Sequence, residues 1–245
     1  MITRTGLIIG VTELEEKGRF LRVLCEDGIF EIYVRGAKKA TSKNNPGTEI
    51  FCYSKICATQ GKNGYVLDST EVLRQFYNIR LDLKKLALAN FFAEVITSNG
   101  IGIGDERDET LKLFLLCLHY LNKDDNERSL SVIKSAFELR YSCEIGFIPK
   151  LLGCDECHKY DGDLSFVIES GKLLCGVHNP HGMGTPVDNT LLHAIRFICL
   201  SDLKKICDFK INKNDEKKLS DISQSYLTYH TERHYKAVEY YNRLN

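Results

Sequence analysis

The chain has 245 residues, of which 43% are hydrophobic, so it can bury a sizeable core and is not generally disordered. Its 33 Lys and Arg balance 33 Asp and Glu, which excludes a strongly basic surface overall and restricts any nucleic-acid binding to a local patch. No apolar run approaches the roughly 18 residues of a membrane span, and the N-terminus lacks the pattern of a secretory signal. We therefore expect a cytoplasmic protein without a membrane partner.

The cysteines of this chain do not indicate a disulfide framework. Seven of the ten stand singly among apolar neighbours: Cys25, Cys52, Cys57, Cys117, Cys143, Cys199 and Cys207. Such cysteines are expected to be small buried residues of a protein in a reducing compartment. Only Cys154, Cys157 and Cys175 form a patterned group.

Residues 1–78 are predicted to form a β domain. Runs of β-branched and aromatic residues are separated by turn signals, notably Asp27-Gly28 and the sequence GKNG at 61–64. The predicted strands are Thr5–Val11, Phe20–Cys25, Ile29–Arg35, Glu49–Ala58 and Tyr65–Leu73. Short strands with no helix between them favour a five-stranded OB barrel, a small fold that binds oligonucleotides.

Residues 79–245 are predicted to form an all-α domain, because the apolar period changes from two to about 3.6 after Phe76. Asp82 is the expected N-cap of the first helix. The predicted helices cover residues 81–96, 108–122, 127–145, 186–200 and 216–244. An insertion at about 151–185 has neither period, so the fold class is α+β, with the helical domain interrupted by a knuckle. Most tyrosines of the last helix are expected in the core.

The insertion carries a pattern of metal ligands. Cys154-x2-Cys157 is followed, after seventeen residues, by Cys175-x2-His178. Two close pairs separated by such a loop are typical of tetrahedral zinc sites, because each knuckle turn directs two ligands to one centre.

A hairpin is expected to bring the two pairs together, with Ser165–Ser170 as a strand before a turn at Ser170-Gly171. His158 and His181 compete with His178 as the fourth ligand. Four protein ligands leave no open position for water, so we expect one structural Zn2+ that staples a segment too short to form its own core.

The sequence carries no motif of nucleotide hydrolysis, metalloprotease or zinc-deaminase chemistry. The glycines at 100–104 follow a helix and lack the spacing of a dinucleotide-binding loop. We therefore expect a protein that is not an enzyme, and a zinc-dependent hydrolase is the disfavoured alternative.

A local excess of basic residues in the β domain is the candidate for DNA contact. Residues 1–80 hold twelve Lys and Arg against nine Asp and Glu. An OB barrel grips single strands with its strand faces and adjoining loops. The candidate DNA-binding residues are Arg19, Arg22, Arg35, Lys38, Lys39 and Lys43. Any one of the nearby aromatic residues is expected to fill the barrel more often than to stack on a base. These are Phe20, Phe30, Tyr33, Tyr53 and Tyr65.

Three segments together resemble the bacterial RecO family of recombination mediators. They are TGLIIGVTELEEKGRFLRVLCEDGIFEIYVRGAKKATSK at 5–43, FELRYSCEIGFIPKLLGCDECHK at 137–159 and YLTYHTERHYKAVEYYNRL at 226–244. The middle segment is the most specific, because a helix, Gly-Phe-x-Pro and a C-x2-C knuckle follow in that order. The family's knuckle usually ends in C-x2-C, so the pair Cys175-x2-His178 departs from the family in ligand identity.

The resemblance implies an N-terminal OB fold, a helical domain and a zinc knuckle. It also implies binding of single- and double-stranded DNA, annealing of complementary strands, and work at the nucleoid with RecR to load RecA onto strands coated by single-stranded-DNA-binding protein. The helical domain would dock the C-terminal tail of that coating protein, with Lys134 or Arg140 as the cation beside the tail's carboxylate. The alternative is a protein-only adaptor that bridges RecR and the coating protein with little intrinsic affinity for DNA.

Overall fold

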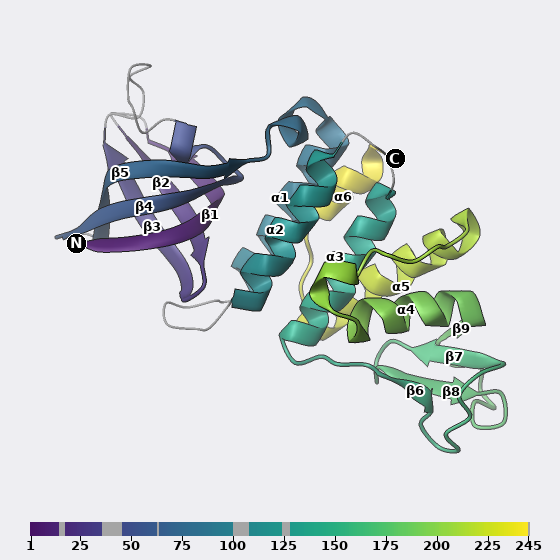
Figure 1. Cartoon of the computed structure of the whole chain (residues 1–245). Coiled ribbons are helices and arrows are strands. Elements are labelled where there is room, and N and C mark those ends of the chain that lie inside the picture. The colour runs from purple at the N-terminus through teal and green to yellow at the C-terminus, as the bar shows by residue number, and fades with distance from the viewer. Residues whose placement is uncertain (15–17, 36–45, 63, 100–107, 124–127, 245) are drawn as a thin grey trace. The chain divides into compact units, whose positions relative to one another are not determined.

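The computed structural model describes the chain apart from residues 15–17, 36–45, 63, 100–107, 124–127 and 245 (Figure 1). The chain divides into two compact units. The first contains Met1–Asp124 and Tyr235–Asn245, and the second contains Asp125–His234. The sequence predicts a boundary after residue 78 between two domains that fold separately, which is a different division from that into compact units. This boundary stays a prediction. No helix in the described ranges has both the length and the apolar character that crossing a membrane requires.

The first unit begins with a closed barrel of five strands in the order β1-β2-β3-β5-β4. The strands are β1 (Ile2–Glu13), β2 (Gly18–Cys25), β3 (Gly28–Arg35), β4 (Cys52–Gly61) and β5 (Gly64–Gln75). All neighbouring pairs are antiparallel except β3 and β5, whose short parallel contact at Ile32–Tyr65 and Tyr33–Val66 closes the barrel. The predicted five-stranded barrel is confirmed.

Alternation of side chains along each strand builds the barrel core. In β3, Phe30, Ile32 and Val34 point inward and are buried, whereas Glu31 and Arg35 are exposed. Burying one such apolar side chain contributes roughly 1.5–3 kcal/mol. Closure pairs the two outer strands of the sheet with each other over the short contact of β3 with β5, and the outer surface of the barrel faces away from the core.

Within the described residues, three helices complete the first unit. They are α1 (Leu83–Ser98), α2 (Asp108–Asn122) and α6 (Lys236–Arg243), with short 3-10 turns at Pro46–Thr48 and Tyr77–Leu81. The Asp82 side chain accepts hydrogen bonds from the backbone N–H groups of Lys84 (2.8 Å) and Lys85 (3.1 Å), so the predicted N-cap is confirmed. Phe51, just before β4, packs edge-on against Phe114 of α2 with ring centroids 6.0 Å apart.

The predicted last helix over 216–244 is wrong, because the structure contains two helices there. The first, α5 (Lys213–Thr231), ends where Glu232 adopts the left-handed conformation with φ of 52°. Tyr235 then packs edge-on against Phe91 of α1, with ring centroids 5.8 Å apart. The apolar period continues across this break, so periodicity alone cannot reveal it. As predicted, most tyrosines here are buried, although Tyr229 and Tyr240 are exposed.

The start of α6 is capped by another helix. The Glu94 carboxylate of α1 accepts hydrogen bonds from the backbone N–H groups of Lys236 (3.0 Å) and Ala237 (2.7 Å). Tyr235, the N-cap position of α6, makes no side-chain cap of its own. A carboxylate at this position also interacts favourably with the helix dipole. Glu94 therefore supplies the cap that the local sequence lacks.

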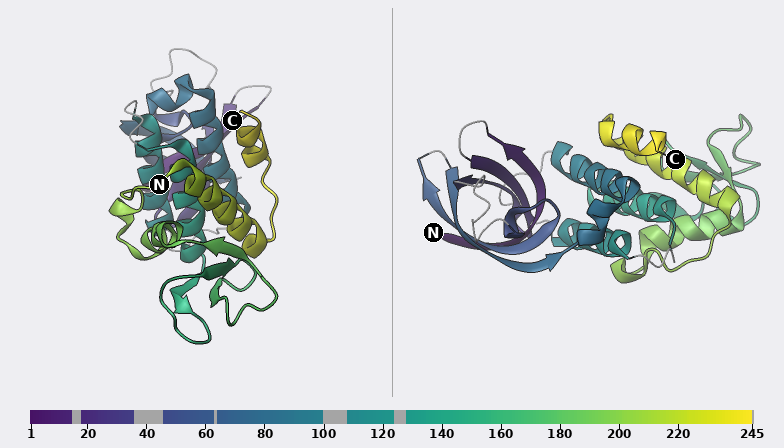
Figure 2. Two further views of the ribbon diagram at one scale, coloured as in Figure 1. Left: turned by 90° about the vertical axis from the view of Figure 1, so that its right-hand side faces the viewer. Right: turned by 90° about the horizontal axis from the view of Figure 1, so that it is seen from above.

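The second unit contains α3 (Leu130–Glu144), α4 (Asn189–Leu200), α5 and a 3-10 turn at Leu203–Lys205. Helix α3 packs against both α4 and α5 (Figure 2). The starts of two predicted helices shift inward by three residues. Ser129 caps α3, and Asp188 caps α4. Residues 186 and 187, expected in the helix, instead belong to a strand that covers Thr185–Val187.

A small sheet interrupts the helices of the second unit at the position where the knuckle insertion is predicted. Its strands are β6 (Lys150–Cys154), β7 (Leu164–Val167), β8 (Lys172–Cys175) and β9 (Thr185–Val187), in the order β6-β8-β7-β9. Strands β7 and β8 form an antiparallel hairpin through a turn in which Gly171 has φ of 64°. Strand β6 pairs in parallel with β8. The ends of β6 and β8 therefore lie next to each other.

Candidate metal centre and nucleic-acid interface

The first metal-ligand pair lies in a tight turn at the end of β6. The Cys154 carbonyl accepts from the His158 N–H (2.9 Å), and the Cys154 N–H donates to the Lys159 carbonyl (2.9 Å). This turn folds back closely on Gly153, where an added Cβ would lie 2.8 Å from the Lys159 carbonyl oxygen. Glycine is required there because any side chain would collide with the turn that carries Cys157.

The second pair follows the hairpin. Cys175 is the last residue of β8, and its carbonyl accepts from the His178 N–H (2.9 Å). The backbone N–H of Cys175 also donates to the Cys154 sulfur (3.4 Å). The hairpin predicted around Ser170-Gly171 is confirmed, and it brings the two pairs to one point.

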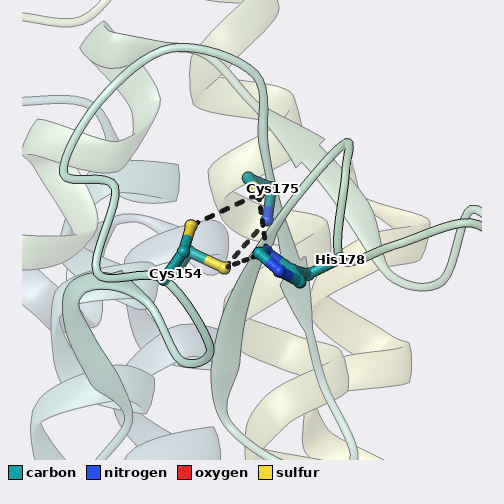
Figure 3. Close-up of side chains that lie close together, drawn as sticks. Cys154, Cys175 and His178 are labelled. Atoms are coloured by element: carbon teal, nitrogen blue, oxygen red, sulfur yellow. Dashed lines mark hydrogen bonds between the residues drawn. The ribbon is translucent and has the colours of Figure 1, made fainter.

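The four ligand atoms form a compact cluster, all within 4.8 Å of one another. Figure 3 shows Cys154, Cys175 and His178 converging. The sulfurs of Cys157 and Cys175 are 3.7 Å apart, and His178 Nδ1 lies 3.7 Å from the Cys154 sulfur and 3.2 Å from the Cys175 sulfur. Tetrahedral ligands at Zn–S distances of about 2.3 Å are themselves separated by roughly 3.7 Å. The cluster can therefore hold a tetrahedral metal ion.

The electrostatics of the cluster favour thiolates. Burial acts to raise the pKa of the Cys154 thiol, but backbone N–H groups of Cys157, Cys175 and Glu156 stabilise the sulfur anion and lower that pKa to about 6. The backbone N–H of His178 likewise lowers the pKa of Cys175. Because thiolates are the metal-binding form, the two knuckle turns prepare the sulfurs for a cation.

The competing histidines lie outside this cluster. His158 and His181 are both exposed, whereas His178 contributes Nδ1 to the group of four. The structure thus places His178 with the three cysteines. Cys157 is the exposed member, while Cys154 and Cys175 are buried.

A groove of about 520 Å3 lies on the barrel. Its lining combines aromatic rings, two cations and glycines: Leu14, Phe20, Tyr33, Arg35, Gly61, Lys62, Gly64, Tyr65 and Val66. The rings of Phe20 and Tyr33 are 5.3 Å apart at an angle of 48°, and Phe20 is 40% exposed. The Tyr33 ring rests on Gly18, where an added Cβ would approach it to 2.6 Å. Gly18 therefore sets the position of one wall of the groove.

Three of the predicted DNA contacts are described by the structure. Arg35 is exposed and lines the groove. Arg22 is exposed on β2 and pairs with Glu31 (3.1 Å). Arg19 is only 7% exposed, and its guanidinium pairs with Glu49 (3.4 Å) and donates to the Thr48 hydroxyl. Lys38, Lys39 and Lys43 lie outside the described residues.

The aromatic candidates divide by position. Phe20, Tyr33 and Tyr65 line the groove, whereas Phe30 is buried in the barrel core and Tyr53 lies outside the groove. Sequence reasoning missed Lys62. The glycines around Lys62 predicted the turn between β4 and β5, but they gave no indication of a binding site. The parallel pairing of β3 with β5 brings this turn beside Arg35.

The two predicted cations for a partner's tail are engaged within the second unit. Lys134 is 1% exposed, and its Nζ lies 2.8 Å from the Glu138 carboxylate, which is also buried. Arg140 Nη1 donates to the carbonyls of Cys199 and Ser201, each at 3.1 Å. Both residues stabilise helix packing in this structure.

Comparison with known proteins decides the family. Residues 1–76 match the family model "Recombination protein O N terminal", and residues 80–239 match "Recombination protein O C terminal". The chain belongs to the RecO family. It is 25% identical to the DNA repair protein RecO of Acetivibrio thermocellus, over 98% of this chain and 96% of the relative. It is also 26% identical to that of Dehalococcoides mccartyi, over 98% of this chain and 94% of the relative.

Membership sets the general function. RecO proteins are non-enzymatic recombination mediators of DNA repair, and this chain is one of them. The family also implies interaction with DNA. The resemblance to the RecO family seen in the sequence is therefore confirmed over nearly the whole chain. This member combines an N-terminal barrel with a Cys3His cluster.

Proposed function

We propose that this RecO protein binds single-stranded DNA in the barrel groove and anneals complementary strands. The observation that carries the proposal is the groove lining. Phe20, Tyr33 and Tyr65 offer ring faces, and Arg35 and Lys62 offer positive charge beside them. Stacking on aromatic rings contributes about 1–3 kcal/mol per base, and cations along the same groove bind the phosphates.

Unpaired bases are favoured over duplex in this groove. A base within a duplex has both faces covered by its neighbours, so it cannot stack on Phe20 or Tyr33 without being extruded. An extruded base costs a few kcal/mol of unstacking and unpairing. We therefore propose that double-stranded DNA binds more weakly, through phosphate contacts alone, and that the groove selects single strands.

The test is fluorescence anisotropy with a labelled oligothymidylate across a salt series. Each phosphate contact contributes about 0.7 to the log–log salt slope on single strands, so Arg35→Glu with Lys62→Glu should lower the slope by about 1.4. Lys84→Glu is the matched control. It reverses one charge, as each of the two groove substitutions does alone, on exposed α1 surface outside the groove, where a glutamate suits the helix N-terminus; the single variants Arg35→Glu and Lys62→Glu are compared with it. Equal slopes for the native protein and the double variant would reject the groove as the DNA site.

Phe20→Ala separates stacking from charge. Phe20 is 40% exposed, so its loss removes a ring face with little effect on the core. Loss of stacking worth about 1–3 kcal/mol predicts affinity roughly 5–150-fold weaker, with an unchanged salt slope. A fall in slope without a fall in affinity would contradict the stacking role.

For the metal cluster we propose one structural Zn2+ held by Cys154, Cys157, Cys175 and His178. The support is the ligand set and spacing, since three sulfurs and an imidazole nitrogen are the donors that zinc prefers. Elemental analysis of purified protein should give one zinc per chain. Another metal at that stoichiometry would reject zinc and keep the site.

We further propose that this protein works at the nucleoid in the cytoplasm, with RecR, to help load RecA onto strands coated by single-stranded-DNA-binding protein. The C-terminal tail of that protein would dock on the helices. The burial of Lys134 and the carbonyl contacts of Arg140 argue against either as the tail's cation.

The second candidate function is that of a protein-only adaptor. It is favoured by the formal net charge of zero and by the pairing of Arg19 and Arg22 with carboxylates. Retention of RecR binding without DNA binding at low salt would identify the adaptor.

A further inference from the structure

Two cysteines outside the metal cluster are held together at the ends of two helices. Cys143 lies in the last turn of α3, and Cys199 lies in the last turn of α4. Arg140 of α3 donates to the carbonyls of Cys199 and Ser201, each at 3.1 Å, and so fixes the end of α4 against α3. Cys143 follows Arg140 by three residues, on the same helix face. The Arg140 contacts thus hold the backbone of Cys199 against the end of α3 that carries Cys143.

The two thiols differ in exposure and acidity. They are hydrogen-bonded to each other, which lowers the pKa of Cys143, and the positive charge of Arg140 acts in the same direction against burial. The same hydrogen bond, together with burial, raises the pKa of Cys199. Cys143 is half-buried and Cys199 is 7% exposed. By contrast, burial raises the pKa of Cys207 to about 12. A half-buried thiol with a lowered pKa beside a more deeply buried second thiol is the arrangement of a peroxide-reactive cysteine and its resolving partner.

We propose that Cys143 and Cys199 form a reversible disulfide when the protein meets hydrogen peroxide. The Cys143 thiolate attacks one peroxide oxygen, the O–O bond breaks, and the released hydroxide takes a proton to become water. The resulting sulfenic acid is then attacked by the Cys199 sulfur. The S–S bond forms, the S–O bond breaks, and the departing hydroxide leaves with the Cys199 proton as a second water. Two thiols are oxidised and one peroxide is reduced.

This disulfide would join the two ends of the segment that carries the metal centre. The loop between Cys143 and Cys199 contains β6 to β9, and with them Cys154, Cys157, Cys175 and His178. Peroxide that oxidises metal-binding sulfurs would release the ion and the staple it provides. A disulfide across the two ends of the same segment would keep that segment tethered until reduction, so the cross-link protects the second unit during oxidative loss of metal.

Peptide mapping of the full-length native protein tests the proposal directly. The metal-loaded protein is treated with hydrogen peroxide, its remaining thiols are alkylated, and it is digested with trypsin without reduction. Cleavage isolates each thiol on its own peptide, Tyr141–Lys150 and Phe197–Lys204. We expect a linked species two hydrogens lighter than the two peptides together, which disappears on reduction with dithiothreitol. The proposal would be overturned if peroxide oxidised the metal-binding cysteines while Cys143 remained unlinked and was recovered in its alkylated form.

Variants assign the two roles. Cys199→Ser should leave Cys143 as a sulfenic acid, which dimedone labels on the peptide Tyr141–Lys150. Cys143→Ser should leave Cys199 unoxidised, and Cys207→Ser, the matched buried control, should form the linked species as the native protein does. Linkage of Cys143 to any other cysteine in the native protein would refute the pairing. After chelation, the peroxide-treated native protein should melt at a higher temperature than its reduced form, and Cys199→Ser should lose that difference.

Discussion

The buried ion pair between α3 side chains offers the sharpest test of what holds the second unit together. Lys134 Nζ lies 2.8 Å from one Glu138 oxygen and 3.0 Å from the other, and the two side chains are 1% and 0% exposed. The Ser223 hydroxyl of α5 donates to the same carboxylate (2.6 Å). Lys134→Met keeps the length of the side chain and removes its charge. The carboxylate is then left buried with a single neutral donor.

Breaking a buried pair by removing one partner costs about 3–5 kcal/mol, because the other charge stays desolvated without compensation. Removing both charges with Lys134→Met and Glu138→Leu should be far milder, within about 1 kcal/mol of the native protein. The single variant should therefore be less stable than the double variant by at least about 2 kcal/mol, a difference set by the stranded carboxylate.

The loss should depend on pH in a defined direction. Burial already raises the pKa of Glu138 against the attraction of Lys134, and removing Lys134 raises that pKa further. A carboxyl whose folded pKa exceeds its unfolded pKa, about 4.3, binds its proton more tightly in the folded state. Stability of Lys134→Met is thus highest below the unfolded pKa and falls as pH rises through the folded pKa. Its deficit should be smaller at about pH 5 than at about pH 8.

Urea denaturation followed by far-ultraviolet circular dichroism measures these differences, since the chain has no tryptophan for fluorescence. The three proteins should be compared at both pH values, with a check that the dependence on urea is the same. Equal stability of the single and double variants at neutral pH would show that Glu138 is not stranded. It would refute the view that the charge of Lys134 compensates the cost of burying the Glu138 carboxylate.

Three further predictions concern other parts of the molecule. Cys154→Ser should lower the metal content and the melting temperature together, and chelation of the native protein should produce a similar loss. Gly18→Ala should displace the Tyr33 ring, which the new Cβ would approach to 2.6 Å, and weaken binding of a labelled single strand while metal content stays unchanged. Glu94→Ala should destabilise the first unit by about 1 kcal/mol in denaturation, because α6 loses its cap, whereas Glu94→Gln should recover part of that loss.

The parts of the fold that depend on local pattern could be predicted from the sequence. Strand alternation gave all five barrel strands, and the two knuckle pairs identified the residues of the metal cluster. Asp82 was identifiable as a cap because an N-cap acts within three residues of itself. In each case the determining interactions lie close together in the chain.

Features set by distant contacts escaped prediction. Arg19 looked like a free cation on a strand, but the distant Glu49 and Thr48 enclose it. A lysine in a helix is usually exposed, but the packing of α5 over α3 buries Lys134. The break at Glu232 depends on Tyr235 finding Phe91 more than a hundred residues away in the sequence. No local period contains that information.

The return of α6 to the first unit has a consequence for the order of events during synthesis. The ribosome delivers the barrel, α1 and α2 early, but residues 235–245, which complete that unit, emerge only after the whole of residues 125–234. The early part must therefore wait, with Phe91 and the Glu94 carboxylate uncovered, while a complete second unit is made. Domains generally fold from the N-terminal side as the chain appears, so here the first unit to begin folding is the last to finish. Truncation of the chain before residue 235 would thus damage the barrel-bearing unit, although the lost residues follow the whole of residues 125–234 in the sequence.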